Sequence, residues 1–374
     1  MKRSYIAKRF QSSGAGLSLD TEALAKYKDI IDLSIGDTDF TTDESIINAA
    51  FRDARAGHTH YGDPKGDPEL IDAVCRAWEE DFGQRLPRDH VLVSASSCLG
   101  MALVMLAILD PGDEVIVFSP YFPMYREQIE LAGGVCVDVP TYASEDYAID
   151  EARLRAAITP RTKAIVFNNP TNPTELLARV AQEHNLLIAA DEIYTTYLYE
   201  GDFRPIRTLP GMAERTITLN SFSKNFLMTG WRVGVIIAEP ELLAVMNRIN
   251  GSLIYSAPSV SQRAAIQALA MRKEIREKYV TAYRDRIFYA ADRIEKLPYL
   301  SLVRPKGTFY LFPGVEKTGL DEKAFCKVLL DQAHVLVSPG TPFGVSAAGH
   351  FRIACTVGID RLKAAFDRME KLSF

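Results

Sequence analysis

The sequence predicts an α/β protein in which helices cover a mostly parallel β-sheet, with a smaller α+β domain beside it. Six short apolar segments rich in β-branched residues show little alternation of polar and apolar positions, which is typical of strands buried on both faces. Helix-length segments lie between them, and strands that alternate with helices form parallel sheets. The six segments begin at His90, Asp113, Lys163, Asn185, Arg215 and Val233.

The expected helices of the large domain follow Gly100 and cover residues 124–132 and 175–183. Later, residues 241–248 and 261–295 carry charges at helical spacing, and the segments VRPKGTFYLFP and HFRIACTV predict strands of the smaller domain. At about 150 residues per domain, 374 residues suit two domains or slightly more. We therefore expect a large domain over residues 46–280. The small domain is expected to combine residues 1–45 with residues 281–374.

Composition excludes several classes of protein. Hydrophobic residues make up 47% and charged residues 24%, which are the values of an ordinary globular protein and not of a disordered one. The net charge of −5 argues against a nucleic-acid partner, which needs a basic surface. Five widely spaced cysteines without a C-x-x-C pair predict neither a disulfide framework nor a zinc site, and therefore favour a reducing cytoplasm.

No segment predicts secretion or membrane insertion. The basic, polar N-terminus lacks the apolar core of a secretory signal. The apolar run at residues 101–109 is far shorter than the roughly 20 residues that a membrane-spanning helix needs. We expect neither a membrane nor a nucleic-acid partner.

Polar and aromatic clusters follow the ends of five predicted strands. Because ligands of parallel α/β sheets bind beyond the carboxyl ends of the strands, we expect all five clusters to face one crevice. The clusters are residues 94–97, 120–122, 168–173, 191–194 and 220–224.

The side chains of these clusters suit pyridoxal 5′-phosphate. Lys224 supplies an amine, Asp191 a carboxylate after a very apolar strand, and Tyr194 a phenol, and Arg232 follows eight residues after Lys224. The cofactor's aldehyde needs a lysine for a Schiff base, its ring nitrogen a carboxylate, and its phosphate hydrogen-bond donors. A helix N-terminus also favours a phosphate. Hydroxyl groups are supplied by Ser96 and Ser97, which precede a predicted helix, and by Ser221 and Ser223.

The residues around Lys224 resemble the lysine motif of the class I/II aminotransferases, which are pyridoxal-phosphate enzymes of fold type I. The motif reads Ser221-Phe-Ser-Lys224-Asn-Phe-Leu-Met-Thr-Gly-Trp-Arg232-Val-Gly234, and the resemblance extends over nearly the whole chain. Other similar segments are Asn169-Pro-Thr-Asn172-Pro-Thr, Asp191-Glu-Ile-Tyr194, Tyr61-Gly-Asp-Pro-Lys-Gly66, Phe351-Arg352-Ile and, more weakly, Gly307-Thr-Phe-Tyr310 and residues 108–115.

Two positions depart from the family. Glu175 replaces the glycine that follows the asparagine–proline segment, at the start of a helix where a glutamate is electrostatically tolerated. The phosphate turn, usually rich in glycine or alanine, reads Ser96-Ser97-Cys98, so which of these residues contacts phosphate stays open.

The resemblance implies a role for each cofactor-binding residue. Lys224 would form the Schiff base and then act as the catalytic base. Asp191 would keep the ring nitrogen protonated, and Tyr194 would bind the phenolic oxygen. Phe122 would stack on the ring, although Tyr121 and Tyr125 compete for that role. The cofactor would also be held by Ser96, Ser97, Cys98, Asn172, Ser221, Ser223 and Arg232.

The substrate and the partner subunit are implied in the same way. Arg352 and Asn172 would bind the substrate's α-carboxylate, and the backbone at Gly36 would approach the substrate. Tyr61 would reach the phosphate of the neighbouring subunit, which implies a homodimer. Each residue also has a plain structural interpretation: a turn for Asn172 or Gly36, a helix cap for Asp191, and a surface side chain for Tyr61.

The expected reaction moves the amino group of an L-amino acid to a 2-oxo acid, with 2-oxoglutarate as the acceptor that the resemblance favours. Aspartate is slightly favoured as the donor, and aromatic residues and alanine stay open. A pyridoxal-phosphate C–S β-lyase acting on a sulfur amino acid would share the whole site. Three further classes of protein are weaker candidates. A cofactor-binding regulator would need a DNA-binding segment, a cofactor-free Schiff-base enzyme would not need phosphate ligands, and nucleotide enzymes carry glycine motifs that this chain lacks.

Overall fold

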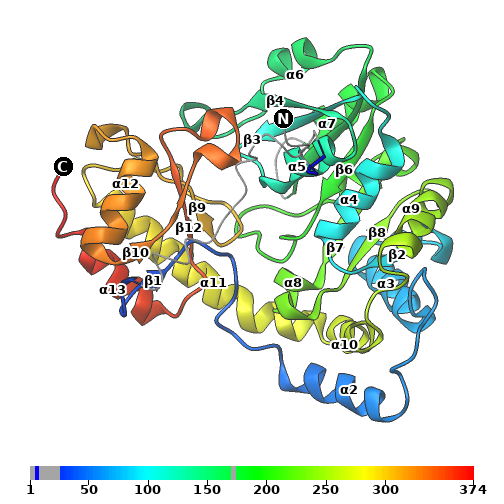
Figure 1. Ribbon diagram of the computed structural model, residues 1–374. Coiled ribbons are helices and arrows are strands. Elements are labelled where there is room, and N and C mark those ends of the chain that lie inside the picture. Colours follow the sequence, from blue (N-terminus) through cyan, green and yellow to red (C-terminus); the bar gives the residue numbers. More distant parts are fainter. Residues whose placement is uncertain (1–4, 8–25, 170–173) are drawn as a thin grey trace.

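The computed structural model describes residues 5–7, 26–169 and 174–374. A seven-stranded sheet with helices on both faces forms its larger part (Figure 1). In spatial order the strands are β2 (Val91–Ser94), β8 (Gly234–Ile237), β7 (Thr216–Ser221), β6 (Leu187–Asp191), β5 (Thr162–Asn168), β3 (Glu114–Ser119) and β4 (Val135–Pro140).

Within this sheet β8 runs against its two neighbours, β2 and β7, and the other pairs are parallel. The predicted, mostly parallel sheet is therefore confirmed, and the carboxyl ends of the remaining strands meet at one edge. Because β8 is reversed, it begins at that same edge, which brings the residues just before Gly234 there as well. The prediction missed β4, an edge strand in which only Val139 is buried, so its sequence lacks an apolar run.

Side chains of the central strands alternate between two buried faces, which explains why their sequences lack polar alternation. Val115 and Val117 of β3 pack on one face, and Ile116 packs on the other. Burial of each such side chain contributes about 1.5–3 kcal/mol. One face is covered by α4 (Ser97–Ile108), α5 (Met124–Leu131) and α9 (Pro240–Leu253). The opposite face is covered by α3 (Pro68–Phe82), α6 (Glu151–Ala157), α7 (Thr174–Glu183) and α10 (Ser259–Ala270), and α2 (Glu44–Arg55) packs against α10.

The smaller α+β part has a separate core built around Phe325, Phe351 and Phe366. Its antiparallel sheet has the order β11 (Ser338–Pro339), β12 (Phe351–Ala354) and β9 (Tyr310–Leu311). Near the N-terminus, β1 (Ile31–Asp32) pairs in parallel with β10 (Val335–Leu336). The helices of this part are α12 (Glu322–Val328), continued by a π-helical turn (Leu329–Ala333), and α13 (Ile359–Met369).

The long helix α11 (Arg272–Glu295) extends through both parts (Figure 1). Ile275 and Tyr279 pack with the larger part, and Ile287 and Ile294 pack in the core of the smaller part. The domain limits stay a prediction, and the limit expected after residue 280 falls inside this helix. The single helix expected over residues 261–295 is instead two, α10 and α11, which meet at Met271 without a proline or glycine that could have indicated the break.

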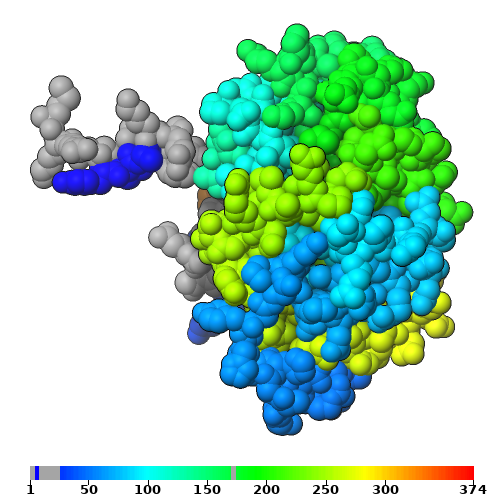
Figure 2. Space-filling model, turned by 90° about the vertical axis from the view of Figure 1, so that its right-hand side faces the viewer, coloured from blue at the N-terminus to red at the C-terminus, as the bar shows by residue number. Residues whose placement is uncertain are grey.

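The face seen in Figure 2 shows residues of α2 and α3 in blue against the yellow-green surface of α9 and α10. Among the described residues, no helix combines the length and apolarity needed to cross a membrane. The same residues contain no group of three or more side chains suited to hold a metal ion.

Candidate active site

Lys224 lies on the short helix α8 (Phe222–Asn225), directly after β7. Ser221, the last residue of that strand, caps the helix, because its Oγ accepts a hydrogen bond from the Ser223 amide at 3.1 Å. The Lys224 Nζ donates to the carbonyl oxygen of Gly36 at 2.5 Å and lies 6.0 Å from the centre of the Phe309 ring. The capped turn therefore presents the half-buried amine at the carboxyl edge of the sheet.

Asp191, the last residue of β6, places a buried carboxylate at the same edge. Its Oδ2 accepts a hydrogen bond from the Tyr125 hydroxyl at 2.5 Å, whereas its buried Oδ1 has no partner among the described residues. Burial raises the pKa of Asp191 to about 6, against the lowering effect of the Tyr125 hydrogen bond. A buried acceptor without a partner is energetically costly, and a hydrogen-bond donor on a bound ligand would remove that cost.

Tyr194 and Arg352 meet at Tyr310. The Tyr194 hydroxyl donates to that of Tyr310 at 3.3 Å, and burial raises the pKa of Tyr194 well above its ordinary value, so the phenol stays neutral. The Arg352 guanidinium lies between the rings of Tyr310 and Phe343, at 4.6 Å and 4.8 Å from their centres. Its Nη2 donates to the Ser34 carbonyl at 2.6 Å, and its buried Nε has no partner among the described residues. A carboxylate is the natural ligand of such a guanidinium.

A single stretch of backbone connects the amine and the guanidinium. Ser34 and Gly36, two residues apart, accept the bonds from Arg352 and Lys224. Gly36 is buried, and a Cβ at this position would collide with the Tyr310 hydroxyl. The predicted close approach of the backbone at Gly36 therefore has a steric reason in this structure.

The first turn of α4 and the start of β8 form a second polar region at this edge of the sheet. Ser96 has φ 97° and caps α4, its Oγ accepting from the Leu99 amide at 3.2 Å. A Cβ on Gly234 would lie 2.8 Å from the Ser97 amide nitrogen, so the absence of a side chain lets β8 begin against this turn. Two residues earlier, Arg232 donates to the Thr229 carbonyl at 2.7 Å.

Arg232 acts electrostatically on the same turn. Surrounding protein atoms raise the pKa of the Cys98 thiol, and the Arg232 charge opposes that effect. A helix N-terminus with an arginine beside it is suited to bind a phosphate.

The aromatic residues near Asp191 have different environments. Tyr125 is buried on Asp191, and Tyr121 is buried with its hydroxyl accepting from the Arg126 Nε at 2.9 Å. Phe122 remains 40% exposed and packs edge-on against Tyr125, with ring centres 5.7 Å apart. Of the three candidates, Phe122 therefore has the most ring surface left for stacking on a ligand.

One predicted residue, Tyr61, lies apart from this arrangement. Tyr61 is 88% exposed and packs against Tyr255, with ring centres 5.2 Å apart. An exposed side chain on a loop is compatible with a contact to a second subunit. Asn172 lies outside the described residues.

Sequence reasoning missed three contacts of the site. Tyr125 was considered only for stacking, although its hydroxyl is the donor to Asp191. Tyr310 belongs to a weakly similar segment and received no role of its own. Ser34 contributes a carbonyl, which every residue carries, so its residue type held no signal.

The residues at the crevice fit pyridoxal phosphate. An amine on α8, a buried carboxylate oxygen without a partner among the described residues at the end of β6, a neutral phenol in the turn after β6 and the start of α4 lie at one edge of the sheet. The unpaired Nε of Arg352 adds a place for the carboxylate of an amino acid. The individual roles of these residues stay predictions.

Comparison with known proteins identifies the family. A family model described as aminotransferase class I and II matches residues 28–369. The arginine–pyruvate transaminase of Pseudomonas aeruginosa is 34% identical over 99% of this chain and 97% of its own length. The aspartate/prephenate aminotransferase of Thermus thermophilus is 37% identical over 92% of this chain and 91% of its own length.

The solved aspartate aminotransferase of Thermus thermophilus with maleate has a TM-score of 0.92 and 34% identity, and the match covers 99% of this chain and 100% of that one. These findings confirm the predicted family, fold type and enzyme class. The chain belongs to the class I and II aminotransferases and is a pyridoxal-phosphate-dependent amino-acid aminotransferase.

Proposed function

We propose that this aminotransferase moves the amino group of an L-amino acid to 2-oxoglutarate, with aspartate as its preferred donor. The observation that carries the amino-acid part is the stacked Arg352 guanidinium with an unpaired Nε, beside the Lys224 amine on the same backbone stretch. Relatives named for aspartate, and the solved relative with the dicarboxylate maleate, support a dicarboxylate donor. Because another relative is named for arginine, amino donors other than aspartate must also be tested.

When bound, the cofactor supplies an aldehyde that takes up the amino group and a ring that accepts the electrons of the broken Cα–H bond. Lys224 would hold the aldehyde in the resting enzyme. Asp191, whose Oδ1 has no donor among the residues that the structure describes, would hold the proton on the ring nitrogen, and Tyr194 would donate to the phenolic oxygen. The first turn of α4 and Arg232 would bind the phosphate.

Lys224 would also move the proton of the reaction. The freed amine would take the proton from Cα of the donor amino acid and deliver it to C4′, the aldehyde carbon of the cofactor. A positioned amine of this kind contributes about 10²–10⁴-fold in rate. Arg352 would fix the α-carboxylate and thereby orient the Cα–H bond toward this amine.

The proposed donor is tested by a panel of amino acids, with the cofactor absorbance followed in single half-reactions and 2-oxoglutarate as the acceptor. We expect aspartate to give the highest kcat/KM, followed by aromatic donors and alanine. Faster turnover of another donor would contradict the aspartate proposal. Release of pyruvate and a thiol from a sulfur amino acid, without any oxo-acid acceptor, would instead indicate lyase activity.

Arg352→Ala is expected to raise KM for every donor and to lower kcat/KM by about 30- to 5000-fold, because loss of a buried charged partner costs about 2–5 kcal/mol. Arg352→Lys keeps the charge but lacks the planar pair of N–H donors of a guanidinium, so it should recover only part of the lost kcat/KM. Steady-state kinetics with aspartate, phenylalanine and alanine provide the measurement. If KM rose for one donor and not for the others, Arg352 would recognise the side chain of that donor and not the common α-carboxylate.

We further propose a cytoplasmic homodimer in which Tyr61 of one subunit contacts the cofactor phosphate of the other. The exposure of the Tyr61 side chain supports the contact between subunits, and the five free cysteines support a cytoplasmic location. Mixed dimers of Lys224→Ala and Tyr61→Phe subunits test the dimer, because each would contain one site with both residues intact. Sites with wild-type cofactor affinity should therefore appear after subunit exchange. If mixing never restored them, Tyr61 would not act across an interface.

A further inference from the structure

The loop that carries Tyr61 is held at its base by charged residues. Residues 56–66 connect the end of α2 to the start of α3, and the Tyr61 side chain is exposed at its tip. Asp53 lies in the last turn of α2, and Asp67 caps α3 by accepting from the Glu69 amide at 2.9 Å. The two carboxylates therefore mark the two ends of this loop.

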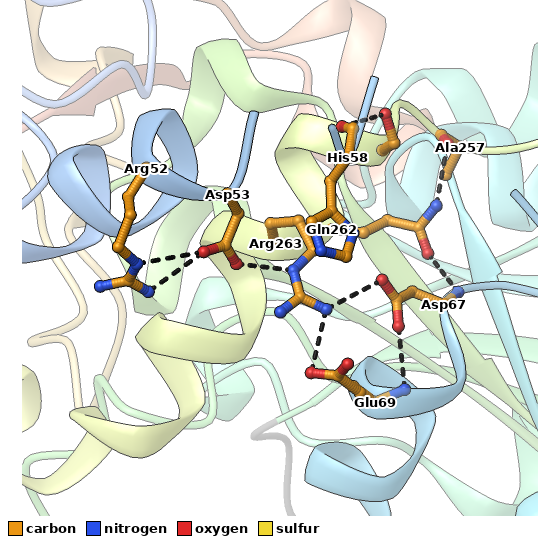
Figure 3. Close-up of polar contacts among 9 residues, drawn as sticks. Arg52, Asp53, His58, Asp67, Glu69, Ala257, Gln262 and Arg263 are labelled. Carbon is orange, nitrogen blue, oxygen red and sulfur yellow. Dashed lines mark hydrogen bonds and ion pairs between the residues drawn. The ribbon is translucent and has the colours of Figure 1, made fainter. Parts of the chain in front are cut away.

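One guanidinium joins both ends. Arg263 of α10 is largely buried, with 11% of its side chain exposed, and its Nε donates to the Asp53 Oδ2 at 2.7 Å (Figure 3). Its Nη1 lies 3.3 Å from the Asp67 Oδ2 and 3.0 Å from the Glu69 Oε2. Figure 3 shows Arg263 between Asp53 on one side and Asp67 and Glu69 on the other.

The residues around Arg263 strengthen the same connection. The Asp67 amide donates to the Gln262 Oε1 at 2.6 Å, and the Gln262 Nε2 donates to the Ala257 carbonyl at 2.9 Å. Ser259 donates through its Oγ to the His58 carbonyl at 3.1 Å. The start of α10 thus holds both the Tyr61 loop and the segment before Ser259, which contains the Tyr255 that touches Tyr61.

Three carboxylates so close together need a positive charge. Burial works to raise the pKa of Asp53, but Arg263 holds it below its ordinary value. Without that charge the carboxylates would repel one another, and the two ends of the loop would lose their common partner. A loop with fixed ends has fewer conformations to lose when its tip binds a ligand, which strengthens binding.

We propose that Arg263 is a positioning residue for Tyr61: it fixes the base of the 56–66 loop and thereby sets the cofactor affinity of the neighbouring subunit's site. The inference rests on the proposed contact of Tyr61 across the dimer. Arg263 itself touches neither cofactor nor substrate in this scheme.

A double-mutant cycle tests the proposal on the cofactor-loaded dimer. Arg263→Gln, Tyr61→Phe and the double variant are compared by the dissociation constant of pyridoxal phosphate and by kcat at saturating cofactor. We expect each single variant to weaken cofactor binding by about tenfold, and the double variant to be no weaker than the weaker single one, because both changes remove the same contact. The kcat at saturating cofactor should change little.

Hydrogen exchange of the loop gives a readout that does not depend on activity. Arg263→Gln should accelerate amide exchange within residues 56–66, whereas Tyr61→Phe should leave the base of the loop protected. Arg263→Lys should restore only part of the protection, because an ammonium group cannot fork between Asp53 and Asp67. If Arg263→Gln fails to fold, Asp53→Asn removes one end of the connection and carries the same expectations.

Arg272 offers a matched control. It is similarly buried, with 17% of its side chain exposed, and pairs with Glu80 and Asp81 at the other end of α3. Arg272→Gln should lower stability without changing cofactor affinity or exchange within residues 56–66. Equal effects of Arg272→Gln and Arg263→Gln would overturn the proposal in favour of a general loss of stability.

The outcomes separate this inference from the proposed function. Unchanged cofactor affinity in Tyr61→Phe would refute the role of Tyr61 itself. If Tyr61→Phe weakened cofactor binding and Arg263→Gln did not, the role of Arg263 would be refuted and the dimer contact would stand. The same would follow if the two losses of cofactor affinity added up in the double variant. Unchanged exchange of the loop in Arg263→Gln would refute it as well.

Discussion

Lys224→Ala is expected to abolish transamination and the absorbance of the covalently bound cofactor while leaving the fold intact. The loss should exceed about 10⁴-fold, because one amine both holds the cofactor and transfers the proton. The fold should persist because the described bond of the amine is a single contact with the Gly36 carbonyl, and the packing around α8 does not depend on it. Absorbance spectra, single half-reactions and circular dichroism provide the measurements.

Lys163 provides the control for this variant. It is the second residue of β5, at the amino end of the strand and so at the opposite edge of the same sheet, where its Nζ pairs with the Asp113 carboxylate at 2.9 Å. Lys163→Ala should therefore leave the rate and the cofactor absorbance unchanged. Full activity in Lys224→Ala would refute the assignment of Lys224.

Asp191→Asn is expected to bind the cofactor and to lose about 10³-fold or more in rate. The amide cannot hold a proton on the ring nitrogen, so the electrons left at Cα lose their stabilisation in a site where electrostatic terms are large. The rate of the donor half-reaction at saturating cofactor is the measurement. An unchanged rate would remove Asp191 from the reaction.

Neutralising a buried carboxylate elsewhere in the sheet is the control for Asp191→Asn. It shows whether loss of any buried negative charge lowers the rate. Glu114, at the amino end of β3, is buried and bonded to Arg161 and Thr159. Glu114→Gln should lower stability but leave the half-reaction rate within a few-fold of wild type. A comparable loss of rate in both variants would mean that the Asp191 effect is structural.

The cofactor-free protein provides a second readout for Asp191. Its pKa is raised from 3.8 to about 6 in the fold, so the carboxyl is protonated in both the folded and the unfolded state at low pH. As the pH rises from about 4 through 6, the unfolded chain gives up this proton more readily, and the fold loses about 3 kcal/mol of stability. Cofactor-free Asp191→Asn should therefore melt at a higher temperature than the wild type at pH 8, and the difference should shrink as the pH falls and vanish below about pH 3.

Much of the fold and of the site could be predicted because the relevant signals are local. The central strands have uninterrupted apolar sequences since their side chains alternate between two covered faces, as Val115, Ile116 and Val117 do. The edge strand β4 is only partly buried, apart from Val139, and gave no such signal. The polar residues after the strands were informative because parallel strands end at one edge, which brings Asp191 and Lys224 to the same edge of the sheet without further information.

The sequence by itself determined the chemical groups of the site and the edge of the sheet where they lie. Only the tertiary structure decided which groups touch: Lys224 bonds a carbonyl 188 residues away, and Arg352 bonds one 318 residues away. Every residue has a backbone carbonyl, so no pattern of side chains could reveal which carbonyls accept these two bonds. The bond from Tyr125 to Asp191 depends in turn on how α5 packs against the sheet, and long-range packing of that kind leaves no local periodicity to detect.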